Sequence, residues 1–171
     1  MDVRIIKAAS VHARLLPGIE RSAGKSFLNV PGYEWIASDT VMTAKAHLKL
    51  IDKGTVWLTV GADDHVWGFL SAEVFEDTLH IWEISVHQEA QGQGIGRKLM
   101  AAAETYAVQE GIKAVSLTTF RDVPFNAPYY ARLGYATMGE VELDRRLRSI
   151  LADEVAAGLS ADTRCAMIKR L

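Results

Sequence analysis

A glycine-rich loop between a strand and a helix places the strongest constraint on how this chain can fold. The loop reads QGQGIGR over residues 91–97, after a β-type run over 78–86 and directly before an amphipathic helix over 95–110. Its three glycines leave the backbone N–H groups at the helix start uncovered. Open amides at the positive end of a helix dipole predict a cradle for a phosphate group.

The segments around this loop alternate between strand and helix patterns, with no linker, repeat or low-complexity stretch. We therefore expect a single α/β domain over residues 1–171. A short polar link over 62–65 predicts an antiparallel hairpin, and the helical crossover after the loop predicts a parallel strand at 114–119. Further helices are expected after Ser10, where Pro17 kinks or divides the helix, after Ser38-Asp39 as cap, and over 125–133 and 142–158. Further strands are expected over 3–8, 55–60, 66–74, 135–138 and 164–169.

Composition narrows the partners that the chain can have. Its formal net charge is −2, and no run of Lys or Arg exceeds a pair, which argues against nucleic acid or an anionic membrane as the main partner. The one cysteine, Cys165, permits no disulfide within the chain. With a charged N-terminal segment and no long apolar run, we expect a cytoplasmic protein.

Two familiar phosphate-binding loops fit the sequence poorly. The spacing Gly92-x-Gly94-x-Gly96 differs from the G-x-G-x-x-G of dinucleotide-binding folds, and the next strand ends in Thr118-Thr119 where an acidic ribose ligand is expected. No Lys-Ser/Thr pair follows the last glycine, so a P-loop is equally disfavoured.

Two motifs resemble those of the GNAT superfamily of acetyl-CoA-dependent N-acetyltransferases. The first is Gln91-x-x-Gly94-x-Gly96 after a strand that ends at Val86, and the second is NAPYYARLGY over 126–135. The order of elements agrees over nearly the whole chain. The resemblance implies a central mixed, mostly antiparallel sheet flanked by helices, with a parallel strand pair splayed at the acetyl-CoA site.

The resemblance also assigns residues to acetyl-CoA as a co-substrate. The pyrophosphate would bind the amides of 92–97, the pantetheine arm would pair with 84–86 like an extra strand, and the Val86 N–H would face the thioester oxygen. Asn126 would contact the same arm; the alternative is that it only caps a helix. Arg97 would add positive charge beside the pyrophosphate; the alternative is a solvated helix residue. The expected cofactor residues are Ile84, Ser85, Val86, Gln91, Gly92, Gln93, Gly94, Ile95, Gly96, Arg97, Asn126 and Tyr129.

Acetyl transfer to an amine requires an acid and a base. An alkylammonium has a pKa of roughly 10.4, so a base must take its proton at neutral pH. Glu83, a carboxyl group in an otherwise apolar strand, is the favoured base; His80 and a water relay are the alternatives. Strict alternation would place His80 and Trp82 on one face of the strand, and Glu83 with Ser85 on the other.

Tyr130 matches the position of the family's acid, four residues before Gly134. Its phenol would donate a hydrogen bond to the departing thiolate; the alternative is a core tyrosine beside Tyr129.

We expect the acceptor to be the primary amine of a small molecule. Phe27, Tyr33 and Trp35 fall in the segment that lines the acceptor site in this superfamily, and Glu34 and Asp122 are candidates to hold a cationic amine. The alternatives are a protein N-terminal or lysine acetyltransferase and a non-catalytic acyl-CoA-binding regulatory domain. The isolated residues His12, His47 and His65 predict no metal site, and a homodimer remains possible for such a fold.

Overall fold

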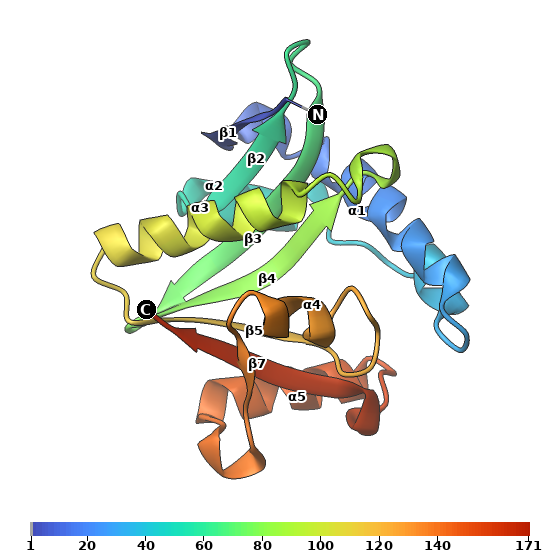
Figure 1. Cartoon of the computed structure of the whole chain (residues 1–171), viewed down its shortest axis with the longest axis vertical. Helices are drawn as coiled ribbons and strands as arrows, with labels where there is room; N and C mark the ends of the chain where they lie inside the picture. Colours follow the sequence, from blue (N-terminus) through green and yellow to red (C-terminus); the bar gives the residue numbers. More distant parts are fainter. Residues whose placement is uncertain (1) are drawn as a thin grey trace.

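A computed structural model of the protein describes residues 2–171. Its strands form one mixed sheet in the order β1-β2-β3-β4-β5-β7-β6, in which β4 and β5 diverge toward one end (Figure 1). Every neighbouring pair is antiparallel except β4 with β5. The strands are β1 (Arg4–Lys7), β2 (Val56–Val60), β3 (Val66–Phe75), β4 (Thr78–Val86), β5 (Ala114–Phe120), β6 (Ala136–Thr137) and β7 (Arg164–Arg170).

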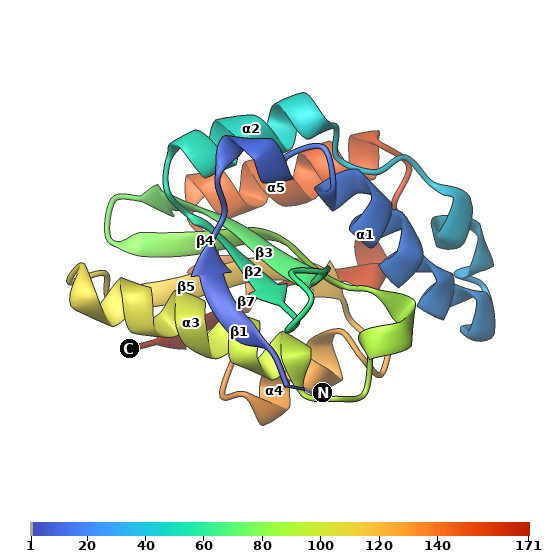
Figure 2. The ribbon, with the colours of Figure 1, turned by 90° about the horizontal axis from the view of Figure 1, so that it is seen from above.

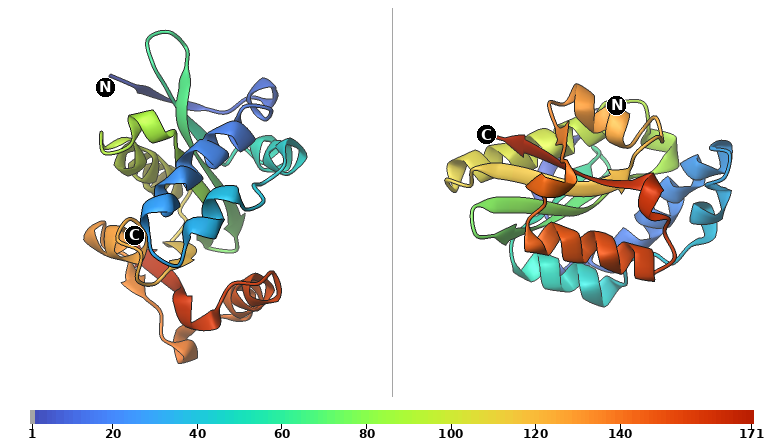
Figure 3. Two further views of the ribbon diagram at one scale, coloured as in Figure 1. Left: turned by 90° about the vertical axis from the view of Figure 1, so that its right-hand side faces the viewer. Right: turned by 90° about the horizontal axis from the view of Figure 1, so that it is seen from below.

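Helices cover both faces of the sheet, with α1, α2 and α5 on one side and α3 and α4 on the other (Figures 2 and 3). One apolar core lies between the sheet and α3 with α4, and a second lies under α1 and α2. Within residues 2–171, none of the helices is long and apolar enough to cross a membrane. The helices are α1 (Leu16–Gly24), α2 (Ala44–Asp52), α3 (Ile95–Gln109), α4 (Ala127–Arg132) and α5 (Arg145–Ala156).

The parallel pair is short, and this opens the sheet. Strand β4 pairs with β5 only from Thr78 to Ile81, opposite Ala114 to Leu117. Beyond that point β5 stays paired with β7, whereas the end of β4 has no partner on that side. The predicted hairpin of β2 and β3, the parallel crossover and the splayed parallel pair are therefore confirmed.

A bulge in β4 corrects the predicted alternation of its side chains. Ser71 pairs with Glu83 and Ala72 with Ile81, so Trp82 is an extra residue in the strand. One extra residue reverses the alternation beyond it, because two residues of one strand then face one of the other. Glu83 consequently lies on the same face as His80, under α1 and α2, and not on the opposite face as strict alternation predicts.

Two helix starts also differ in detail from the prediction. The first predicted helix is divided as Pro17 suggested, into a 3₁₀ turn over Ser10–His12 and α1, with Pro17 in the first turn of α1. The cap of α2 is Thr43, whose hydroxyl accepts the Ala46 N–H, and not Ser38-Asp39. Ser38 instead ends a 3₁₀ helix over Glu34–Ser38, designated η3, where its hydroxyl donates to the Trp35 carbonyl.

Candidate active site

A cavity of about 820 Å³ occupies the gap where β4 and β5 diverge. Its walls come from β4, the glycine loop, α4, the segment between α1 and α2, and the facing ends of β5 and β7. Of the residues predicted to bind acetyl-CoA or, as Glu83 and Tyr130, to act in catalysis, only Gln93 does not line it; the Gln93 side chain turns back to donate to the Glu89 carbonyl at 3.3 Å. The predicted residues that the structure brings together are Glu83, Ile84, Ser85, Val86, Gln91, Gly92, Gly94, Ile95, Gly96, Arg97, Asn126, Tyr129 and Tyr130.

The glycine loop forms an open cradle at one end of the cavity. Gly92 and Gly94 have φ values of 72° and 78°, the left-handed conformation that favours glycine. A Cβ atom on either would meet no other atom within 4 Å, so the space above them is free for a ligand. Gly94 is the N-cap of α3 and has no side chain to cover the first amides of that helix.

Gln91 fixes this loop to its surroundings. Its Nε2 donates to the Val86 carbonyl at 3.0 Å, and its Oε1 accepts the Ser26 hydroxyl at 2.7 Å. The glutamine thus ties the loop to the end of β4 and to the segment after α1. Its position stabilises the cradle from beneath, while Arg97 lines the cavity at the start of α3.

The free edge of β4 presents backbone groups to the same cavity. The His87 N–H donates to the Trp67 carbonyl at 2.7 Å, which marks a hydrogen-bonded pair of β3 and β4. Because such pairs alternate along an antiparallel ladder, the N–H groups of Ile84 and Val86 point away from β3. They face the gap toward β5 and can pair with an extended ligand.

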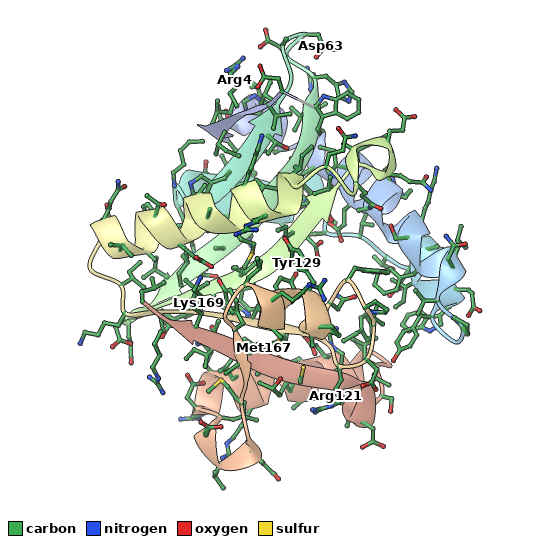
Figure 4. The ribbon with its side chains drawn as sticks, in the orientation of Figure 1. Arg4, Asp63, Arg121, Tyr129, Met167 and Lys169 are labelled. Carbon is green, nitrogen blue, oxygen red and sulfur yellow. The ribbon has the colours of Figure 1, made fainter. Side chains whose placement is uncertain are left out.

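Two polar atoms of the 126–135 motif are buried without a partner. Asn126 is the N-cap residue of α4, but its side chain makes no capping hydrogen bond; its Nδ2 donates to the Thr119 hydroxyl at 2.9 Å, and its Oδ1 has no partner within residues 2–171. The Tyr129 hydroxyl is also unpartnered and lies 3.1 Å from the position that a Cβ of Gly96 would take. Figure 4 shows Tyr129 between α4 and α3. Unpaired buried groups of this kind are costly unless a ligand satisfies them.

These features fit the acetyl-CoA that the sequence motifs imply. Its pyrophosphate suits the open amides of the cradle, and its amide-rich arm suits the edge of β4 with the free Asn126 oxygen. A methyl group at Gly96 would crowd the Tyr129 hydroxyl, so that glycine allows α4 to approach α3.

Glu83 projects into the middle of the cavity and is unusually basic. The Ser85 hydroxyl donates to its Oε1 at 2.7 Å. Burial, and next to it the nearby carboxyl group of Glu20, raise the pKa of Glu83 to about 8, against the opposing effect of the Ser85 hydrogen bond. A carboxyl group with such a pKa can both accept and release a proton near neutral pH.

Tyr130 completes the centre of the cavity. Its ring is only 7% exposed, and it packs edge-on against Tyr129 with centroids 5.2 Å apart. Burial, and next to it the charge of Glu83, raise the pKa of Tyr130 above its usual value. The phenol is therefore protonated at neutral pH and is available as a hydrogen-bond donor.

His80, the alternative base, lies outside this cavity. It is fully buried, and its Nδ1 is 3.0 Å from the Ser116 hydroxyl. Burial, together with the charge of Arg146, lowers the pKa of His80 to about 3. The structure thus places Glu83, and not His80, beside Tyr130.

The sequence prediction missed several charged residues of the cavity. Glu34 and Asp122, the predicted ligands of a cationic amine, do not line it; Glu20, Asp39, Glu154 and Arg164 do. His47, predicted to be isolated, is buried with its Nε2 3.5 Å from Glu20 Oε2. Helical spacing carried a signal for Glu20, because it follows the buried Leu16 by four residues and so shares its face.

Comparisons with known proteins agree with this arrangement. A family model described as Acetyltransferase (GNAT) family matches residues 26–135. The PaiA N-acetyltransferase from Thermoplasma acidophilum, solved with coenzyme A, is 17% identical, with a TM-score of 0.71 over 100% of both chains. N-acetylglutamate synthase from Neisseria gonorrhoeae, solved with coenzyme A and N-acetyl-glutamate, is 20% identical, with a TM-score of 0.71 over 100% of this chain and 35% of that one.

A further likeness is to the ribosomal-protein-S18-alanine N-acetyltransferase from Escherichia coli, at 15% identity and a TM-score of 0.68. That comparison covers 99% of this chain and 94% of the other. At these identities the three structures establish a shared fold. The second and third are named for different kinds of product, N-acetylglutamate and an acetylated alanine of a ribosomal protein, so the fold alone leaves the acceptor of this chain open.

Proposed function

The chain belongs to the GNAT acetyltransferase family, and on that premise we propose that it moves acetyl from acetyl-CoA to the primary amine of a small molecule. The observation that carries this proposal is the placing of Glu83 and Tyr130 in one cavity, between the glycine cradle and an aromatic end. A binding protein needs the cradle but has no use for a basic carboxyl group beside a buried phenol. Acetyl transfer needs the cradle, the basic carboxyl group and the buried phenol together.

The residues that hold acetyl-CoA are those of the cradle and of the β4 edge. Amides of 92–97 and Arg97 take the pyrophosphate, while Ile84, Val86 and the Asn126 side chain take the pantetheine arm. Tyr129, between α4 and α3, offers its unpartnered hydroxyl to the same ligand. Bound there, acetyl-CoA supplies the thioester that is to be attacked.

Glu83 acts as the base, either directly or through one water. Its carboxylate takes the proton of the acceptor ammonium, which leaves a neutral amine with a free electron pair. The amine attacks the thioester carbon; an N–C bond forms, the C–S bond breaks, and the second proton of the nitrogen leaves to solvent or, by way of the Tyr130 hydroxyl, to the departing sulfur. The Val86 N–H, aimed into the cavity, stabilises the oxyanion that develops in between.

Tyr130 acts on the leaving group. Its hydroxyl donates to the sulfur as negative charge builds there, so that coenzyme A leaves as a thiol or as a hydrogen-bonded thiolate. Cys165 is not among the residues that line the cavity, and the proposal therefore has the amine attack acetyl-CoA directly, with no acetyl-enzyme stage.

Thiol release from acetyl-CoA tests the proposal. The acceptors are small amines (polyamines, amino acids and aminoglycosides) and peptides with a free N-terminus or lysine, with acetyl-CoA binding measured in parallel by calorimetry. We expect amine-dependent release with at least one small-molecule class. Release with peptides alone would favour a protein acetyltransferase, and binding without release would favour a regulatory acyl-CoA-binding domain.

A further inference from the structure

The part of the cavity wall that contains Glu83 and the segment after α1, designated the acceptor end, has an uneven charge. It is formed by α1, by the segment that follows it as far as Thr40, and by parts of β5, β7 and α5. Four carboxyl groups and one guanidinium lie there, whereas the whole chain has nearly balanced charges of 21 acidic and 19 basic residues. The charged residues are Glu20, Asp39, Glu83, Glu154 and Arg164.

Two of these carboxyl groups, those of Glu20 and Glu83, lie near each other, and the basic side chain that contacts Glu20 is that of His47, with Nε2 3.5 Å from Oε2. The Glu20 side chain is 16% exposed, and the Met42 N–H donates to its two oxygens at 3.1 and 3.2 Å. No ion pair within residues 2–171 joins Glu20 or Glu83 to a lysine or arginine. Neighbouring acidic groups of this kind repel one another, and a cation bound between them relieves the repulsion.

The one guanidinium at this end is already neutralised. Arg164 donates from Nε and Nη2 to the two oxygens of Glu154 at 2.8 and 2.9 Å, and both side chains are less than 20% exposed. The Thr118 hydroxyl donates to the same carboxylate at 2.6 Å, which holds it in place. A carboxylate on the acceptor would have to displace Glu154 from a two-pronged pair, so an anionic acceptor is disfavoured.

Aromatic side chains form part of the remaining wall of the acceptor end. Phe27 packs edge-on against Phe120 and Phe125, with centroid distances of 5.6 and 5.0 Å. Trp35, from η3, lines the cavity with its side chain 46% exposed, and the exposed carboxyl group of Asp39 follows it in the chain. Such a wall accommodates methylene groups, and an indole and a carboxylate that line the same cavity both favour an ammonium group.

We propose that the acceptor is an aliphatic diamine or polyamine, with its reacting amine at Glu83 and Glu20 and its second ammonium at Asp39 and Trp35. The methylene spacer lies along Phe27 and its two aromatic neighbours. This inference rests on the proposed transfer to a small-molecule amine and adds the acceptor's chemical class. Asp39 and Trp35 determine specificity and take no part in the chemical step.

Three acceptors of equal length test the class. Butane-1,4-diamine, butylamine and 4-aminobutanoate differ only in whether the far end is cationic, apolar or anionic. We expect kcat/KM for the diamine to exceed that for butylamine by about tenfold or more, and 4-aminobutanoate to be the poorest. Propane-1,3-diamine and pentane-1,5-diamine then show which spacing suits the second ammonium.

Asp39→Asn locates the second subsite. In this variant the ratio of kcat/KM for butane-1,4-diamine to kcat/KM for butylamine should fall, because KM for the diamine rises. The kcat/KM for butylamine itself should stay within about twofold of wild type. Asp52→Asn, an exposed position in α2 outside the cavity, makes the same change of net charge and should leave the ratio unaltered. Trp35→Leu should lower the same ratio without touching any carboxylate.

The outcomes separate this inference from the proposed function. If butylamine or 4-aminobutanoate matches the diamine, or if Asp39→Asn affects all three acceptors alike, the diamine proposal is overturned and amine acetylation stands. If no small amine elicits thiol release although acetyl-CoA binds, the proposed function fails, and this inference fails with it.

Discussion

The substitution Tyr130→Phe removes a single oxygen atom and thereby tests turnover separately from acetyl-CoA binding. Tyr130→Phe keeps the buried ring and removes the donor to the leaving sulfur, so kcat should fall by about 100-fold while acetyl-CoA affinity stays within about threefold. Stopped-flow or steady-state thiol release and calorimetric binding measure the two quantities.

A matched control for Tyr130→Phe lies five residues along the chain. Tyr135 is 3% exposed and its hydroxyl donates to Glu104 at 3.0 Å, outside the cavity. Tyr135→Phe therefore removes a buried hydroxyl at a cost in stability but should leave kcat nearly unchanged. Equal turnover in Tyr130→Phe and wild type would exclude the acid role.

Glu83 and Glu20 together predict a specific pH dependence. Glu83 works as a base only when deprotonated, so kcat/KM should rise with pH through its pKa of about 8. Glu20 contributes to raising that pKa; in Glu20→Gln this repulsion is lost, the pKa of Glu83 falls, and the acidic limb of the profile moves to lower pH.

The pH–rate profiles of wild type, Glu20→Gln and Glu83→Gln test this coupling. Glu83→Gln should lose the limb altogether, along with a factor of about 100 in kcat/KM. An unshifted limb in Glu20→Gln, or a limb that persists in Glu83→Gln, would assign the titration to another group or to water.

At the residue scale, the sequence predicted those site residues that lie in a short motif or are chemically unusual for their segment. The glycines of 92–96, the residues Asn126, Tyr129 and Tyr130 of the second motif, and the carboxyl group in β4 all line one cavity. Glu20, Asp39 and Glu154 were missed because each comes from a different helix or loop, and only the fold brings them to one space. His47 is a related case, since its contact with Glu20 joins two helices that are not adjacent to the motifs.

Helix α3 offers an internal control for the role of the cradle. It is bracketed by two glycines with φ near +75°, Gly94 at its start (78°) and Gly111 after its end (72°). An added Cβ meets no atom within 4 Å at either position, so alanine imposes similar backbone strain, about 1 kcal/mol, at both. Only Gly94 lies in the cavity.

Gly94→Ala and Gly111→Ala should therefore lower Tm by similar amounts but differ in binding. Gly94→Ala should weaken acetyl-CoA binding by about tenfold or more, because the methyl group intrudes on the open amides, whereas Gly111→Ala should bind normally. Calorimetric titration of both variants decides; equal affinities would show that the pyrophosphate binds elsewhere.

At the element scale, the bulge at Trp82 marks the limit of pattern-based prediction. Strict alternation of side chains predicted that Glu83 lies on the face opposite His80. The extra residue in β4 reverses the alternation beyond it, so that Glu83 lies on the face that α1 covers. Nothing in the local sequence marks this bulge, since it depends on the register with β3. The strands and helices themselves were predicted well, because their apolar periodicity is strong. The 3₁₀ segments within 25–38 were not predicted, since their apolar periodicity is weak.

At the scale of the molecule, the reaction cavity exists because the two parts of the sheet are joined only in part. Strands β1 to β4 and strands β5 to β7 share four paired positions, from Thr78 to Ile81, and then separate. The opening is held by the core on the side of α3, which contains residues of both parts together with Tyr130 from α4. The stability of the domain and the shape of the cavity therefore depend on the same buried cluster.

This shared core leads us to propose that residues 1–171 form one cooperative domain. Buried side chains from β2, β3, β4, α3, β5, α4 and β7 belong to a single cluster, so neither part of the sheet retains a complete core without the other. Scanning calorimetry should give one transition with equal calorimetric and van't Hoff enthalpies, and saturating acetyl-CoA should raise its Tm as a whole. Two transitions, of which acetyl-CoA shifts only the one that includes the glycine loop, would show that the two parts fold independently; the cavity would then be an interface between domains and not a gap within one.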